Sequence, residues 1–335
     1  MKKIGLFCMV LLLAGSLIGV LAAGREAVAD APIVLRLAET HSQDYPTTQG
    51  NYEFARLVEE RTNGRIKIEV YHSSQLGEER AVLEQVQFGA IDFTRVSISP
   101  LSAFVPEFDA LQMPFLYRSG EHMWQVLEGE IGREFLASLE ESESGFIGLC
   151  FYDAGARNLY NSRREIKTVE DVRGLKIRVQ EAPLMMRLIE LMGGVPTPMP
   201  FGDVYSALQT GVIDGAENNW PSYYSTSHYE VAKYFTQNGH TMVPEITVAS
   251  SISMAKLSED DQEIIRQAAW DSMDFQKEKW ADFEAEAEQI IRDAGNIITM
   301  PTPEAIAGFQ KAMEPLYAAQ PAYVQDVIAR IQAVK

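Results

Sequence analysis

The sequence predicts an α/β protein of two lobes, with mainly parallel sheets and one long helix that spans both lobes. Strand and helix patterns alternate along the first half of the 335 residues, the alternation starts again after residue 170, and a 35-residue helical pattern follows. Such alternation is typical of parallel sheets whose connecting helices cover both faces. The length is sufficient for one large domain or two smaller ones.

The first half supplies two strand–helix units and the start of a third strand. Apolar residues at 33–37 predict the first strand, and 47–62 place apolar side chains at helical spacing before an Asn-Gly stop. Apolar and charged residues alternate at 66–70, which predicts a second strand. A helix is predicted over 78–88, and 91–93 begin the next strand. We expect these strands to pair in parallel.

The same order returns in the second half. A break of small residues at 153–156 predicts a boundary near 154–158. Apolar and basic residues then alternate at 175–179, and a helix is predicted over 183–192, from a proline to a pair of glycines. The longest helix is predicted over 259–293. At ~1.5 Å per residue it would be ~50 Å long, which is enough to cross both lobes.

These elements predict a chain of five segments. They are a signal peptide at 1–29, a first lobe at 30–154 completed by part of 240–260, a second lobe at 155–239, the lobe-spanning helix at 258–294, and a C-terminal segment at 295–335 that packs on the lobes.

The N-terminal segment has the order of a secretory signal peptide. Lys2 and Lys3 precede an apolar run at 4–23, and the small residues at 27–29 offer a cleavage site. A cut after Ala29 removes three basic residues and one acidic residue, which changes the net charge from −18 to −20. The alternative is a retained membrane anchor, since the run approaches the ~20 residues that span a bilayer. We expect cleavage and a periplasmic protein, because the exit is rich in alanine.

Composition and motifs exclude several functions. The chain has 29 Lys and Arg against 47 Asp and Glu, so most of its surface would repel a nucleic acid. Cys150 is the single cysteine after cleavage and lies in a predicted buried strand, where a nucleophilic role is not expected. The common nucleotide, serine-hydrolase and zinc motifs are missing. We therefore expect no catalytic residue, no cofactor and no metal.

Three arginines stand where open α/β sheets bind ligands, outside the carboxyl ends of strands. Arg178 ends its predicted strand, Arg157 follows the break between the lobes, and Arg95 follows residues 91–93. A guanidinium can hold a carboxylate through two parallel hydrogen bonds. The alternative for each is an internal salt bridge to one of the many acidic residues, and spacing alone leaves both open.

Five sequence runs carry a resemblance to a known family. They are SQLGE at 74–78, RNLY at 157–160, GLKIRV at 174–179, MPF at 199–201 and ALQTGVIDGAEN at 207–218. In this order, and over essentially the whole mature chain, they resemble the DctP-type solute-binding proteins of tripartite ATP-independent periplasmic (TRAP) transporters. The resemblance implies a periplasmic-binding-protein architecture, in which two α/β lobes close over an organic acid.

The resemblance also implies roles for individual residues. Arg178 matches the family arginine that forms a salt bridge with the ligand carboxylate, and Arg157 matches its supporting arginine. Asn218 matches the asparagine that hydrogen-bonds the same carboxylate, and Phe201 matches an aromatic side chain against the ligand body. Glu78 corresponds to a polar contact from the first lobe.

The first lobe narrows the ligand class. A dicarboxylate requires a second cation and few hydroxyl partners, whereas a polyhydroxylated acid requires mixed donors and acceptors. The runs 41–47 and 93–97, which include His41 and Arg95, are similar to family members that bind sugar acids, especially hexuronates. We expect a hexuronate such as D-glucuronate or D-galacturonate. A C4-dicarboxylate, an aldonate or sialic acid is the alternative.

Several candidates also have structural alternatives. Phe201 could be a core residue, and Glu78 could be an acid in a first helical turn. His41 could satisfy local backbone at a helix entry, and Arg95 could balance a neighbouring aspartate. Asn219 is expected to line the pocket beside the preceding asparagine, although a nearby proline suggests that it shapes a turn.

The expected mechanism is binding without chemistry. The resemblance implies that a monomer closes on a small organic acid and delivers it to the membrane subunits of a TRAP permease, with closure as a population shift. A sensor instead of a permease is one alternative. A secreted lyase or isomerase acting on uronates, with Glu78 or His41 as the base, is another.

Overall fold

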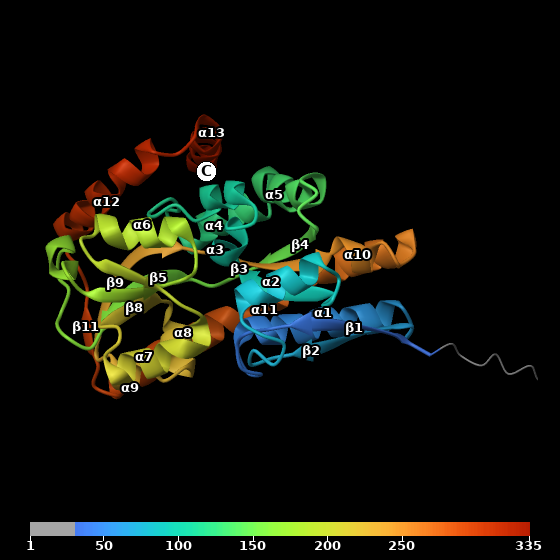
Figure 1. Cartoon of the computed structure of the whole chain (residues 1–335), viewed down its shortest axis with the longest axis horizontal. Helices are drawn as coiled ribbons and strands as arrows, with labels where there is room; N and C mark the ends of the chain where they lie inside the picture. Colours follow the sequence, from blue (N-terminus) through green and yellow to red (C-terminus); the bar gives the residue numbers. More distant parts are fainter. Residues whose placement is uncertain (1–30) are drawn as a thin grey trace, which may run out of the picture. The chain divides into compact units, whose positions relative to one another are not determined.

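Two β-sheets organise the part of the chain that the structure describes, residues 31–335 of a computed structural model (Figure 1). The strands of the first sheet are β1 (Ile33–Ala38), β2 (Ile66–Tyr71), β3 (Phe93–Ser97), β4 (Phe146–Tyr152) and β10 (Glu245–Ser250), in the order β2-β1-β3-β10-β4. The strands of the second sheet are β5 (Ala156–Asn161), β6 (Lys176–Val179), β7 (Val195–Pro198), β8 (Gly215–Asn218), β9 (Tyr234–Met242) and β11 (Ile297–Thr299), in the order β11-β9-β5-β8-β6-β7.

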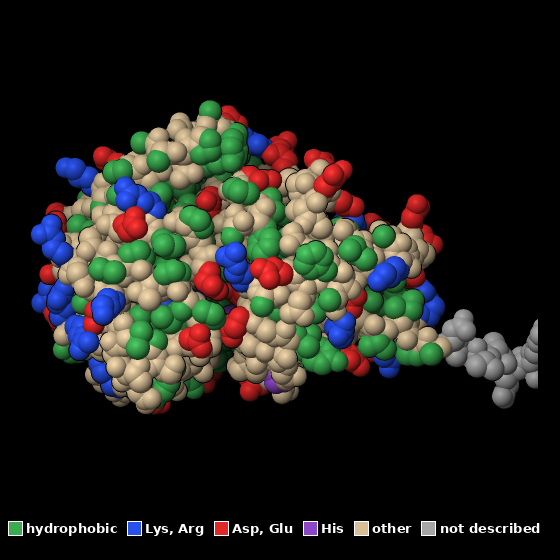
Figure 2. All heavy atoms as spheres, in the orientation of Figure 1, with side chains coloured by type: hydrophobic (Ala, Val, Ile, Leu, Met, Phe, Trp, Pro, Cys, Tyr) green, Lys and Arg blue, Asp and Glu red, His purple; other side chains and the backbone are tan. Residues whose placement is uncertain are grey.

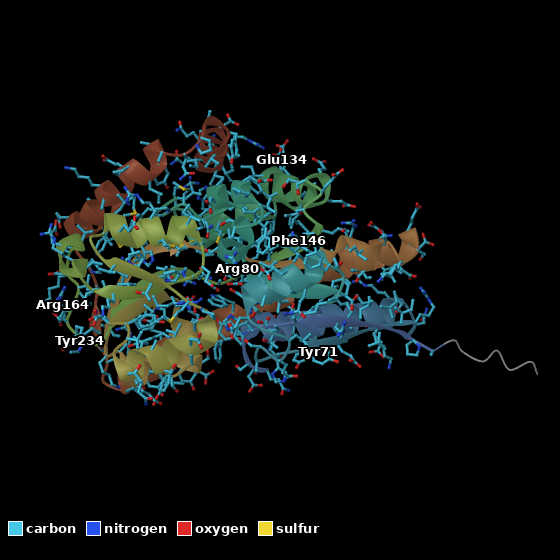
Figure 3. All side chains as sticks on the ribbon, viewed as in Figure 1. Tyr71, Arg80, Glu134, Phe146, Arg164 and Tyr234 are labelled. Carbon is cyan, nitrogen blue, oxygen red and sulfur yellow. The ribbon has the colours of Figure 1, made fainter. Side chains whose placement is uncertain are left out.

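Helices cover both sheets, and side chains fill the space between the layers (Figure 3). The helices are α1 (Pro46–Arg61), α2 (Glu79–Gln87), α3 (Ile98–Ser102), α4 (Gly120–Leu127), α5 (Glu130–Glu141), α6 (Pro183–Leu191), α7 (Val204–Thr210), α8 (Trp220–Ser225), α9 (His228–Val231), α10 (Ser251–Met254), α11 (Glu259–Asp293), α12 (Pro303–Ala318) and α13 (Ala322–Ala333), with short 3-10 helices η1 (Pro106–Leu111), η2 (Val169–Val172) and η3 (Phe201–Asp203). In Figure 1, α6 lies above the second sheet, and α7, α8 and α9 lie below it.

The four helices predicted over 47–62, 78–88, 183–192 and 259–293 are confirmed to within one residue at each end. The signal peptide predicted at 1–29 lies outside the described residues. No helix within residues 31–335 is both long and apolar enough to span a membrane. Acidic and basic side chains are interspersed on the face shown in Figure 2.

The sheets are mixed, and parallel pairings form the majority, as the prediction of mainly parallel sheets requires. Five of the nine strand pairings are parallel and four are antiparallel. The antiparallel pairings involve β10, which lies between β3 and β4, and β5, which lies between β8 and β9. Each of these two strands enters directly from the other sheet. Because antiparallel neighbours require no connecting helix, an alternating strand–helix pattern does not reveal them.

The chain passes between the sheets through two short segments. Residues 153–155 connect β4 to β5, and residues 243–244 connect β9 to β10. Gly155 has a φ of +56°, a left-handed conformation that favours glycine. These two crossing segments lie side by side in the structure, since Ala156 is paired with Met242 at the start of β5.

Helix α11 contributes to the cores of both sheets. Its Ile265 and Met273 pack in the apolar cluster beside the first sheet, whereas its Ala287 and Ile291 pack in a cluster beside the second. Between these positions, Trp280 is buried against residues of the crossing region. The predicted long helix therefore spans both parts of the fold, as its length requires.

The two C-terminal helices pack on both parts of the molecule. Phe309 of α12 is buried in the same cluster as residues of α6. The Tyr317 hydroxyl donates a hydrogen bond to the Pro114 carbonyl at 2.7 Å. In α13, the Ile331 carbonyl lies 3.0 Å from Nε2 of His122 in α4.

Candidate ligand-binding site

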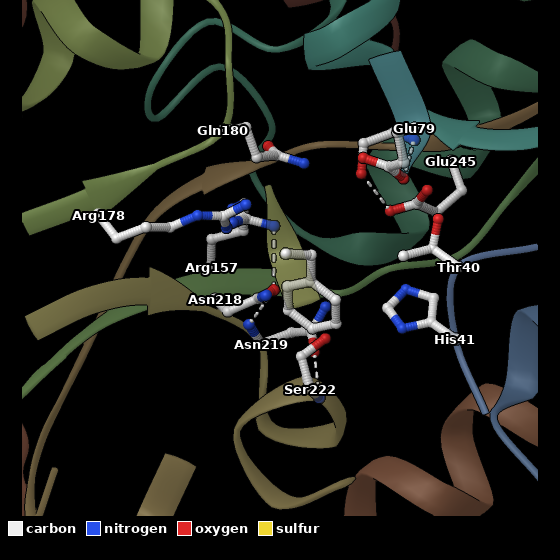
Figure 4. Close-up of a pocket in the computed structure, with 12 residues that line it drawn as sticks. Thr40, His41, Glu79, Arg157, Arg178, Gln180, Asn218, Asn219, Ser222 and Glu245 are labelled. Atoms are coloured by element: carbon white, nitrogen blue, oxygen red, sulfur yellow. Dashed lines mark hydrogen bonds between the residues drawn. The ribbon is translucent and has the colours of Figure 1, made fainter. Parts of the chain in front are cut away.

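A pocket lies between the two sheets, close to the crossing segments (Figure 4). Its cavity volume in this structure is about 20 Å³. We define the first-sheet wall as Thr40, His41, Glu79, Ser97 and Glu245, and the second-sheet wall as Arg157, Arg178, Gln180, Phe201, Asn218, Asn219 and Ser222. Several of these residues follow or end the strands β1, β3, β6 and β8, so the pocket opens at strand carboxyl ends.

Arg178 is a buried cation that makes no ion pair with a carboxylate of the described residues. It is the residue before the last of β6, and 4% of its surface is exposed. Its Nε and Nη2 donate hydrogen bonds to the Met199 carbonyl, at 3.0 and 2.8 Å. Burial lowers the pKa of Arg178, because desolvation disfavours the charged form. An anion in the pocket would therefore stabilise this side chain.

Arg157, in contrast, is already paired with an acid. Its Nε donates to Glu217 Oε2 at 2.5 Å, and its Nη2 donates to Oε1 at 2.8 Å. Burial alone would raise the pKa of Glu217, but Arg157 and a hydrogen bond from His240 bring that pKa to about 2. Arg157 Nη1 also donates to Asn218 Oδ1 at 3.0 Å. Arg157 is thus fixed in position, and its charge is neutralised.

The two asparagines of the pocket have different parts in it. Asn218 Oδ1 accepts hydrogen bonds from Arg157 and from the Asn219 backbone N–H, which leaves its Nδ2 as the donor group toward the pocket. Asn219 caps α8, since its Oδ1 accepts the Ser222 N–H at 2.7 Å. Its Nδ2 donates to the Ala154 carbonyl in a crossing segment. Asn219 therefore lines the pocket and also shapes the turn.

The first-sheet wall is built around Arg95, which is fully buried and does not line the pocket. Arg95 forms ion pairs with Glu39, with Glu79 at 3.0 Å and with Glu245 at 2.6 Å. Ser97 holds the same acids, because its N–H donates to Glu79 and its hydroxyl donates to Glu245. Of the two roles that the sequence left open for Arg95, the geometry shows the internal salt bridge.

His41 joins the two walls. Its ring stacks on Tyr45, with centroids 3.8 Å apart, and meets the edge of Phe201 from the second-sheet wall at 5.2 Å. Its backbone N–H donates to Glu39 at 2.9 Å. Burial, followed by the charges of Arg95 and Arg157, lowers the pKa of His41, so its imidazole is neutral at pH 7.

Glu78 lies outside this pocket. It lines a neighbouring hollow of about 360 Å³, which shares Thr40, His41 and Phe201 with the pocket. Gly202 approaches it so closely that a Cβ there would lie 2.7 Å from Glu78 Oε1. The pocket itself receives Glu79, the next residue along the chain.

The structure thus brings together six of the eight candidates predicted from the sequence, and it places Arg95 and Glu78 elsewhere. The sequence analysis missed Thr40, Glu79, Ser97, Gln180, Ser222 and Glu245. One of them had a usable signal, because Gln180 stands two residues after Arg178 and extended residues at that spacing share a face. Glu245 had none, since it reaches the pocket through β10.

Comparison with known proteins identifies the family. A model of the family DctP, bacterial extracellular solute-binding protein family 7, matches residues 37–322. A solute-binding protein of Chromohalobacter salexigens is 39% identical over 277 residues, which are 83% of this chain and 81% of that protein.

Two solved structures extend the comparison. A TRAP periplasmic solute-binding protein of Bradyrhizobium sp., in complex with D-galacturonate, is 38% identical with a TM-score of 0.86, covering 89% of this chain and 99% of the other. One from Chromohalobacter salexigens, with bound D-glucuronate, is 37% identical with a TM-score of 0.86, covering 90% and 100%. The two-lobed fold predicted from the sequence is thus confirmed. The chain belongs to the DctP family, the solute-binding proteins of TRAP transporters.

Proposed function

We propose that this protein captures a hexuronate, D-glucuronate or D-galacturonate, and delivers it to the membrane subunits of a TRAP permease. The observation that carries this proposal is Arg178, a buried guanidinium at the wall of a small pocket, which has no carboxylate partner within residues 31–335. A ligand carboxylate would supply the missing partner, and Asn218 Nδ2 would donate to the same group.

The rest of the pocket suits a polyhydroxylated ligand body. The first-sheet wall offers the carboxylates of Glu79 and Glu245 as acceptors for sugar hydroxyls. Phe201 and His41 supply flat rings beside them. The uronates bound by the Bradyrhizobium and Chromohalobacter proteins support this ligand class.

The proposal includes closure of two lobes without catalysis. The first lobe would be 30–154, completed by part of 240–260, and the second would be 155–239, so that the crossing segments act as the hinge. A ligand that contacts both walls shifts the population toward the closed form. We further propose that the protein works as a monomer in the periplasm after cleavage of residues 1–29.

A melting-temperature screen tests the ligand class. The purified protein is heated with hexuronates, aldonates, C4-dicarboxylates, sialic acid or neutral sugars. A ligand at ~100 times its dissociation constant adds about 2.7 kcal/mol to the free energy of unfolding, which gives a clear upward shift. We expect the largest shift with D-glucuronate or D-galacturonate. A shift with neutral sugars alone would contradict the carboxylate site, and a shift with dicarboxylates alone would contradict the uronate.

A further inference from the structure

The two walls of the pocket carry opposite charge. On the second-sheet wall Glu217 neutralises Arg157, so Arg178 supplies the positive charge. Glu79 and Glu245 stand on the first-sheet wall, as Figure 4 shows. A ligand that places one carboxylate against Arg178 therefore turns its other end toward two acidic side chains.

The acids of the first-sheet wall outnumber the cation that holds them. Arg95 is the one basic residue paired with Glu39, Glu79 and Glu245, and all three of its nitrogens donate to them. Four of the five N–H groups of Arg95 donate to these acids, and its side chain is fully buried behind the wall. A dicarboxylate would need a second cation at this end, and the wall offers an excess of negative charge instead.

Two further observations show that this end is built to meet a polar, uncharged group. Gln180 is 5% exposed, its Oε1 has no hydrogen-bond partner, and its amide extends between Arg178 and Glu79 (Figure 4). This amide oxygen, on the second-sheet wall, can therefore accept a hydroxyl proton of the ligand. In addition, burial and the neighbouring Glu245, against the opposing effect of Arg95, raise the pKa of Glu79 to about 7, so this wall already resists negative charge.

We propose that the first-sheet wall makes the pocket selective for acids with a single carboxylate and excludes polyhydroxylated acids with a carboxylate at each end. The hydroxyls at the far end of a uronate donate to Glu79, Glu245 and Gln180. A second carboxylate in the same place would face like charges in a space with little water, where repulsion is strong. This inference rests on the proposed function and adds Glu79 and Glu245 as residues that determine specificity.

Calorimetric titration at pH 8 with three matched acids tests the inference. D-Galacturonate belongs to the proposed ligand class, and D-galactonate is an open-chain acid with one carboxylate. Galactarate is an open-chain acid with the same hydroxyls at C2 to C5 and a second carboxylate in place of the C6 hydroxymethyl group. The comparison of galactonate with galactarate isolates the second charge from ring opening. We expect galactarate to bind at least ~100-fold more weakly than galactonate.

Two variants and one control assign the effect to the wall. Glu79→Gln and Glu245→Gln should each reduce the ratio of the affinity for galactonate to the affinity for galactarate by ~10-fold or more. If one variant does not fold, the other alone tests the role of the wall. Glu84→Gln removes the same charge from an exposed position on α2 and should leave the ratio unchanged.

Equal affinities for galactonate and galactarate would overturn the proposed selectivity, and so would an affinity ratio that neither glutamine variant changes. In both cases the proposal that the protein binds a uronate would stand. If D-glucuronate and D-galacturonate both fail to bind, the proposed function fails and the inference fails with it.

Discussion

Arg178 donates hydrogen bonds to a single backbone carbonyl, that of Met199, and its charge is free to bind an anion. Removal of this side chain should therefore reduce ligand affinity far more than it reduces the stability of the fold. We expect Arg178→Ala to lose at least ~100-fold in affinity for D-glucuronate, because a charge-assisted pair in a buried site is lost. Its melting temperature without ligand should not fall, since an unpaired buried charge is removed. Titration calorimetry and thermal unfolding measure both quantities.

Arg187→Ala, which removes an exposed arginine from α6, is the matched control. Unchanged affinity in Arg178→Ala would refute the carboxylate site.

Glu217, in contrast to Arg178, should affect the stability of the fold, because its carboxylate pairs with the buried Arg157. Its folded-state pKa of about 2 is below the ordinary 4.5. The ionised carboxylate therefore stabilises the protein above pH 4.5, and this contribution decreases as the pH falls toward 2. Glu217→Gln should lose about 3 kcal/mol at pH 7, at ~1.4 kcal/mol per pKa unit.

The pH dependence of the free energy of unfolding tests whether this loss comes from the charge of Glu217. Thermal unfolding should show a large difference between wild type and Glu217→Gln at pH 7 and a much smaller one at pH 3. The exposed Glu84→Gln should match wild type at both values. A difference of equal size at both pH values would point to lost packing instead of lost charge.

The residues also show what a sequence can predict about this site. Arg157, Arg178 and Asn218 were identified because they belong to distinctive runs beside recognisable strands. Arg95 occurs in a similar position, but whether an arginine faces a ligand or an internal acid depends on its neighbours in space. Those neighbours, Glu39 and Glu245, are more than 200 residues apart in the chain, so no local pattern links them.

At the scale of elements, helices were predictable and the crossings were not. The helix at 259–293 carries its own signals, with a serine that caps its start and a glycine beyond its end. Strands β5 and β10 instead obtain their neighbours from distant parts of the chain, and their antiparallel pairings make the sheets mixed.

The contact between the first crossing segment and α11 leads to a prediction for Gly155. A Cβ at this position would lie 2.7 Å from Glu284 Oε1 and 3.2 Å from the Trp280 ring. Gly155→Ala should therefore suffer both the cost of a left-handed conformation, ~1–2 kcal/mol, and overpacking against α11, ~1–3 kcal/mol.

A second glycine separates these two effects. Gly174 also has a positive φ, of +76°, but a Cβ there would meet nothing within 4 Å. Urea unfolding should show that Gly174→Ala loses only the conformational part and that Gly155→Ala loses more. Equal losses would mean that α11 does not constrain the crossing segment.

At the scale of the whole molecule, the charge of the protein opposes its proposed ligand. The net charge, −18 for the whole chain, repels an anion over long distances, whereas the pocket attracts it only locally through Arg178. The Debye length falls from ~30 Å in 0.01 M salt to ~10 Å in 0.1 M salt, so added salt screens the surface more than the buried contacts.

The association rate constant for D-glucuronate should therefore rise several-fold between 10 and 150 mM NaCl, and the dissociation rate constant should change little. Stopped-flow tryptophan fluorescence measures both rates. Replacing the exposed Glu141 and Glu143 by lysine raises the net charge by four and should make the association rate less sensitive to salt. An association rate that falls as salt is added would show that the arginines already attract the ligand outside the pocket, and that the acidic surface does not set the speed of capture.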